Sequence, residues 1–177
     1  MNQPEIWLRG PLPNIPELLQ PVAHALLQAR EELNMLMESF DDGLLWVGVA
    51  GLASPGFHLQ HLTGVLNRLF TYADGKQLSE QQLQYLAMEG KQADISSHYL
   101  VKAFNREVDA ALARLSKTNK LSLTQTREVG RGKLPSTVIG LYVHAAEHTM
   151  RHLGQLLVTV RAISTDKLTP GVNVSDN

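Results

Sequence analysis

The chain has 177 residues, 44% of them hydrophobic and 19% charged, a balance typical of a compact globular domain and unlike that of disordered or fibrous chains. Its formal net charge of −1 gives no positive field to attract nucleic acid or anionic lipid. The lack of cysteine excludes disulfides, a thiolate nucleophile and cysteine-based zinc sites. We expect one cytoplasmic domain over 1–177, with its core at about 16–163 and neither nucleic acid nor membrane as a partner.

The first half of the chain predicts two long helices. Apolar residues at intervals of three and four indicate an amphipathic helix over 16–40. The apolar stretch 44–49 is short and flanked by glycine, and no other segment could pair with it as a strand. We therefore expect a connection there. Ser54 then suits the N-cap of a second helix over 55–72, whose first residue is proline.

The second half predicts a short helix and two further long ones. A shorter helical segment is expected over 79–90, because a serine caps its start and a glycine closes it. Apolar periodicity predicts helices over 95–115 and from about 135 to 163, followed by a polar tail that frays. Between them, 116–136 reads as a loop or small hairpin with extended pieces at 121–126. Four long helices without a credible sheet predict an all-α four-helix bundle.

Five of the seven histidines fall in two clusters, one in the second predicted helix and one in the last: His58, His61, His144, His148 and His152. Helical residues four apart project from one face, so His148 and His152 can hold one ion, while His144 turns further towards solvent. Helical bundles build metal sites from imidazoles on facing helices. His61 or His58 would supply a third ligand, leaving open positions for water or substrate.

Other side chains near these clusters have competing interpretations. The histidines themselves could form a solvated polar stripe. Glu147 projects away from His148 and is expected in a surface salt bridge rather than as a ligand. Gln155 could orient a metal ligand or make a plain interhelical hydrogen bond. Arg68 and Tyr72 continue the face of the second helix and either line a pocket for an anionic substrate or simply pack.

The two histidine clusters also carry a family resemblance. A histidine in the second helix, followed near the end of the chain by His-x-x-x-His, a small residue and Gln, resembles the pattern of the DinB-like (YfiT-like) superfamily of metal-dependent enzymes. The matching residues are His61, His148, His152, Gly154 and Gln155. The order of four long helices agrees with that family over about 16–163.

The resemblance implies an up-down-down-up four-helix bundle, frequently a homodimer, with a three-histidine site for a divalent metal such as zinc or nickel. Family members with known activity include thiol S-transferases that use bacillithiol or mycothiol and a mycothiol-dependent isomerase. His58 and His144 depart from the family pattern as extra histidines. The site could therefore be offset by one turn, or His58 could replace His61.

Two functions from different classes follow. In the first, His61, His148 and His152 hold a divalent ion whose open positions bind water or a small-molecule thiol, for thiol transfer or hydrolysis; no catalytic side chain beyond the ligands is indicated. A metal-bound thiol or water loses its proton readily, which would supply the nucleophile that this cysteine-free chain lacks. In the second, the chain is a non-catalytic helical binding or stress-response module that acts as a homodimer.

Overall fold

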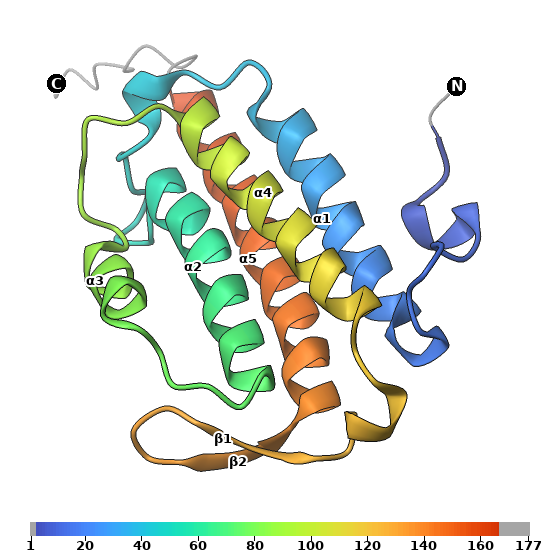
Figure 1. Cartoon of the computed structure of the whole chain (residues 1–177). Helices are drawn as coiled ribbons and strands as arrows, with labels where there is room; N and C mark the ends of the chain where they lie inside the picture. Colours follow the sequence, from blue (N-terminus) through green and yellow to red (C-terminus); the bar gives the residue numbers. More distant parts are fainter. Residues whose placement is uncertain (1–2, 167–177) are drawn as a thin grey trace, which may run out of the picture.

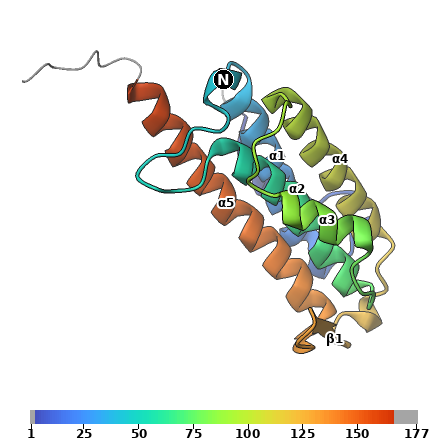
Figure 2. The same cartoon turned by 90° about the vertical axis from the view of Figure 1, so that its left-hand side faces the viewer.

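The computed structural model describes residues 3–166, in which four long helices lie side by side around one core (Figure 1). A shorter helix lies outside the second of them, as the turned view in Figure 2 shows, and a two-stranded hairpin lies at one end. The elements are α1 (Gln20–Met37), α2 (Pro55–Ala73), α3 (Glu80–Met88), α4 (Ser97–Ser116), β1 (Thr126–Val129), β2 (Leu134–Thr137) and α5 (Val138–Asp166). Short 3₁₀ turns cover Ile6–Arg9, Glu17–Leu19, Asp42–Leu44 and Lys120–Ser122.

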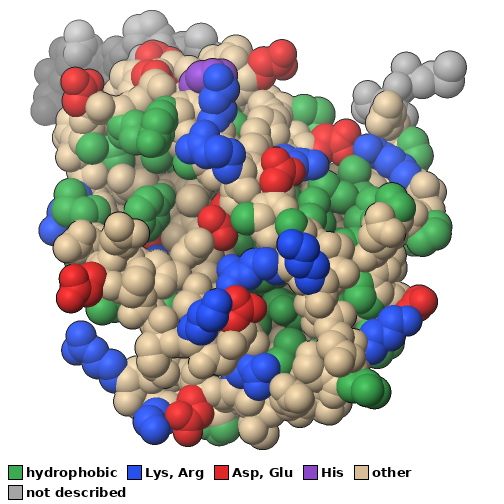
Figure 3. All heavy atoms as spheres, viewed as in Figure 1, with side chains coloured by type: hydrophobic (Ala, Val, Ile, Leu, Met, Phe, Trp, Pro, Cys, Tyr) green, Lys and Arg blue, Asp and Glu red, His purple; other side chains and the backbone are tan. Residues whose placement is uncertain are grey.

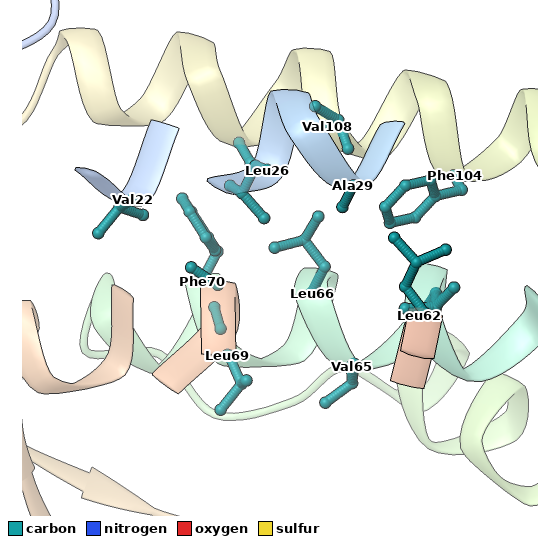
Figure 4. Close-up of a cluster of buried hydrophobic side chains, with 14 of the residues drawn as sticks. Val22, Leu26, Ala29, Leu62, Val65, Leu66, Leu69, Phe70, Phe104 and Val108 are labelled. Carbon is teal, nitrogen blue, oxygen red and sulfur yellow. The ribbon is translucent and has the colours of Figure 1, made fainter. Parts of the chain in front are cut away.

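The core is formed by apolar side chains that recur every three or four residues along the long helices. On α2, Leu62, Leu66 and Phe70 are spaced four apart and fully buried, and they point at α1 and α4 (Figure 4). Phe104 of α4 and Leu156 of α5 are also fully buried. One apolar stripe per helix thus faces the same interior, as the sequence periodicity predicts.

Most helix boundaries agree with the sequence to within a few residues. The Ser54 side chain accepts a hydrogen bond from the backbone N–H of Phe57 and caps α2, as expected. The first helix begins at Gln20 rather than near residue 16, because Glu17–Leu19 form a separate 3₁₀ turn. The stretch 44–49 forms no strand, which confirms its interpretation as a connection.

The hairpin exists but is displaced along the chain from its predicted place. Residues 121–125 are not an extended piece and only Thr126 belongs to β1: Lys120–Ser122 form a 3₁₀ turn, capped by the Asn119 side chain. Residues 134–137, assigned mostly to the last helix, pair instead with β1 in antiparallel register, so α5 begins only at Val138. The last helix runs to Asp166, and the rest of the tail expected to fray lies outside the described residues.

Charged side chains are mixed over the surface. Figure 3 shows basic and acidic groups interspersed across the face seen in Figure 1. This distribution agrees with the net charge of −1. Among the helices described for residues 3–166, none combines the length and the apolar character needed to span a lipid bilayer.

Helix α3 is fastened to α2 at both ends. At its start, Ser79 and Gln82 form a reciprocal capping box, and Gln82 Nε2 also donates to Asn67 Oδ1 on α2 at 2.6 Å. Just beyond its end, the backbone N–H of Gly90 donates to the side-chain oxygen of Gln60 at 2.7 Å. These contacts fix the position of Glu89, the residue that follows α3.

Asn67 also binds a partly buried carboxylate on α4. Its side-chain amide lies 3.1 Å from each oxygen of Glu107. Burial raises the pKa of Glu107, and the opposing effects of the Asn67 hydrogen bond and the Arg114 charge do not cancel this rise. The folded state therefore binds the Glu107 proton more tightly than the unfolded state does. The stability that Glu107 contributes is complete below the ordinary pKa of a glutamate and is lost as the pH rises through the raised value.

We therefore expect Glu107→Gln to increase the free energy of unfolding at pH 7 and to change it little at pH 4. The amide keeps an oxygen that accepts from Asn67 and removes the charge that burial disfavours. Urea unfolding at the two pH values measures the difference. A variant that is less stable than the wild type at pH 7 would contradict this account of Glu107.

Candidate metal centre

The two histidine clusters meet where α2 packs along α5. His61 of α2 and His148 and His152 of α5 each offer one ring nitrogen, and these atoms lie within 4.8 Å of one another. The Nε2 atoms of His61 and His148 are 2.9 Å apart. The ring of His152 is centred 4.3 Å from that of His61 and 4.5 Å from that of His148. The structure thus brings together the three residues that the sequence selected.

The chemistry of this group fits a divalent metal. Burial, followed by the neighbouring imidazoles, lowers the pKa of His148 and brings the pKa of His152 to about 4. Both rings are therefore neutral at pH 7, which is the form that binds metals. The buried Nδ1 of His148 has no hydrogen-bond partner among the described residues, an unusual state for a ring held by protein contacts alone.

A buried carboxylate, which the sequence analysis missed, holds the outer nitrogen of His61. His61 Nδ1 lies 2.7 Å from Glu89 Oε2, and the Glu89 side chain is only 4% exposed. The guanidinium of Arg68 donates to the other oxygen of Glu89 at 2.5 Å. A carboxylate paired with arginine only accepts hydrogen bonds, so the proton of His61 sits on Nδ1. The lone pair of His61 is then on Nε2, which faces His148.

For two residues on α2, the structure favours the packing alternative. Tyr72 is a core side chain. Arg68 is 7% exposed and engaged by Glu89, so it is not free to hold an anionic substrate. Glu147 pairs with Arg151 at the surface, which confirms the salt bridge expected for it.

The two extra histidines lie beside the group of three. His58 is buried, and its Nδ1 is 3.2 Å from Nδ1 of His152. It contacts the group through His152 and does not take the place of His61 in the cluster. The side chain of His144 is 50% exposed. It forms a second, more exposed group with Glu147 and His148 in which ligand atoms also lie within 4.8 Å of one another, but Arg151 engages the carboxylate of that group.

The comparisons with known proteins agree with this arrangement of helices. The sequence model of the DinB superfamily matches residues 25–156. The chain therefore belongs to the DinB superfamily, which includes metal-associated proteins. A comparison with curated proteins gives no significant match.

Three solved structures with a similar fold come from different bacteria. A DinB-like protein from Bacillus cereus is 17% identical with a TM-score of 0.59, over 78% of this chain and 91% of that one. A protein from Streptococcus pneumoniae is 14% identical with a TM-score of 0.59, over 81% and 88%. An uncharacterized protein from Clostridium difficile is 12% identical with a TM-score of 0.62, over 85% and 98%. At these identities the likeness concerns the fold.

Proposed function

We propose that the chain is a metal-dependent enzyme in which His61, His148 and His152 hold one divalent ion, either zinc or nickel. The observation that carries this proposal is the convergence of three imidazole nitrogens within 4.8 Å of one another. The buried Glu89 supports it, because a carboxylate behind a histidine is the usual arrangement at metal sites. The proposal includes a single cytoplasmic domain with the up-down-down-up four-helix bundle implied by the family.

The proposed reaction is the transfer of a low-molecular-weight thiol to an electrophilic carbon, with hydrolysis as the variant in which water replaces the thiol. When bound, the ion would supply Lewis acidity that favours loss of the thiol or water proton. A carbon–sulfur bond forms, the leaving group departs with its electron pair, and the thiol proton passes to solvent. Glu89 keeps the His61 proton on Nδ1, and Phe57 stacks on the His61 ring at a centroid distance of 5.2 Å, covering one of its faces.

The second candidate is a non-catalytic binding or stress-response module that acts as a homodimer. It is favoured by apolar side chains that α5 leaves exposed, namely Val143 at 52%, Leu157 at 41% and Val158 at 63%. Exposed apolar side chains on a helix can contribute to a contact surface. A homodimer is compatible with either candidate.

The test is turnover of zinc- or nickel-loaded protein with a panel of low-molecular-weight thiols and an aryl chloride. We expect turnover by the wild type and only the uncatalysed rate with His148→Ala, in a variant whose circular dichroism shows an intact fold. Hydrolysis is assayed beside it with a panel of esters. A wild type that binds metal, forms a dimer and turns over none of these substrates would favour the binding module.

A further inference from the structure

A pocket of about 570 Å³ lies next to the histidine group, between the start of α2, the loop before it and α5. His58 and His152 form one part of its wall. Leu52, Phe57 and Val158 contribute much of the remainder. The pocket is therefore continuous with the proposed metal centre, and its size is that of a site for a small organic molecule.

The exposed apolar side chains of this pocket indicate what it binds. Leu52 and Val158 are each 63% exposed, although both are large and apolar. They face the same hollow as Phe57, which stacks on His61. The polar side chains of the lining are His58, His152, Arg151, Gln155 and Thr159, and the charge of Arg151 is already paired with Glu147. Such a wall suits an uncharged apolar group with one donor atom.

A glycine forms part of the pocket wall. Gly154 lines it from the middle of α5, where glycine is unfavourable for helix formation. A Cβ atom added there would have no neighbour within 4 Å outside the adjoining backbone. A larger side chain at this position would therefore have open space beside the hollow and would not displace packed atoms.

We propose that this pocket binds the aromatic or alkyl part of a small organic substrate and directs its sulfur or oxygen donor towards the histidine group. The occupant is a small molecule and not a partner protein, because the proposed ligand His152 is part of the wall and the volume matches a ligand with one or two rings. The direction of the donor rests on the proposed function. The binding of the apolar group does not.

The first experiment tests the pocket without metal. The uncharged dye N-phenyl-1-naphthylamine, which fluoresces in apolar surroundings, is titrated into metal-free wild type, Gly154→Leu and Ala113→Leu. Ala113 is exposed on α4 and lies outside the lining of this pocket, so its variant adds the same leucine elsewhere. We expect saturable binding to the wild type and Ala113→Leu, and binding at least about tenfold weaker to Gly154→Leu. Equal binding by all three proteins would overturn the proposal. A Gly154→Leu variant that changes dimerisation and leaves dye binding unchanged would also overturn the proposal.

The second experiment tests the direction of the donor. In cobalt-loaded protein, sulfur-to-cobalt absorption reports thiol coordination, and benzyl mercaptan is compared with 2-mercaptoethanol. We expect benzyl mercaptan to bind the wild type about tenfold more tightly, and this preference to disappear in Gly154→Leu. Equal affinities in the wild type would overturn the proposed direction. Failure of the wild type to bind cobalt would count against the metal centre and against that direction, while the dye experiment still decides whether the apolar group binds.

Discussion

Replacement of Glu89 by glutamine is expected to weaken zinc binding by roughly 10- to 100-fold, although Glu89 is not itself one of the three proposed ligands. The glutamine amide can donate as well as accept, so it no longer holds the proton on Nδ1 of His61. The variant also leaves the Arg68 guanidinium, whose side chain is 9% exposed, without its countercharge. Breaking a buried ion pair from one side lowers the free energy of unfolding by about 3 kcal/mol.

Competition with a chromophoric chelator measures the zinc affinity, and urea unfolding measures the stability. Glu128→Gln is the matched control, because Glu128 lies on the hairpin and pairs with Lys133 through side chains that are 56% and 70% exposed. A surface pair of this kind contributes little to stability. Equal zinc affinities of Glu89→Gln and Glu128→Gln would refute the role of Glu89.

Gly64→Ala is expected to destabilise the protein by about 1–3 kcal/mol and to weaken metal binding, because it overpacks a filled site. A Cβ atom on Gly64 would lie 2.2 Å from Oε1 of Glu89 and 2.6 Å from Nη1 of Arg68. Both side chains are nearly buried and bonded to each other, so neither can move without weakening the contact with His61. Alanine is otherwise the better helix residue by about 1 kcal/mol, so a loss of stability reports the collision directly.

Gly154→Ala is the control with the opposite expected sign. It is also a helical glycine, but its Cβ atom would have no neighbour within 4 Å. We expect it to stabilise the fold by up to about 1 kcal/mol, as measured by urea unfolding. If both alanine variants were equally stabilised, the tight packing of Glu89 and Arg68 against α2 would be contradicted.

The long helices could be predicted from the sequence because each buries one apolar stripe. The residues of that stripe recur every three or four positions along the chain. Leu62, Leu66 and Phe70 show the pattern plainly. The hairpin was misplaced because its strands are only four residues long and their pairing is a contact between segments. Pro135, interpreted as the start of a helix, lies in β2 opposite Glu128.

The histidine group could be predicted in part, for the same reason. The spacing of His148 and His152 fixes their common face, and the family pattern selected His61. Residue spacing alone could not distinguish His61 from His58, because that choice depends on how α2 is rotated against α5. Glu89 was missed since it follows a different helix, 28 residues from His61 along the chain. Its one local signal was an acidic residue directly before Gly90, where α3 ends.

The most direct test of the account is elemental analysis of untagged wild-type protein beside the His148→Ala/His152→Ala double variant, with circular dichroism to show that both are folded. We expect about one divalent metal per wild-type chain and none in the variant, since removal of two of three ligands leaves no stable site. Wild-type protein without metal after incubation with zinc or nickel, or a folded variant that keeps the metal, would contradict the three-histidine centre.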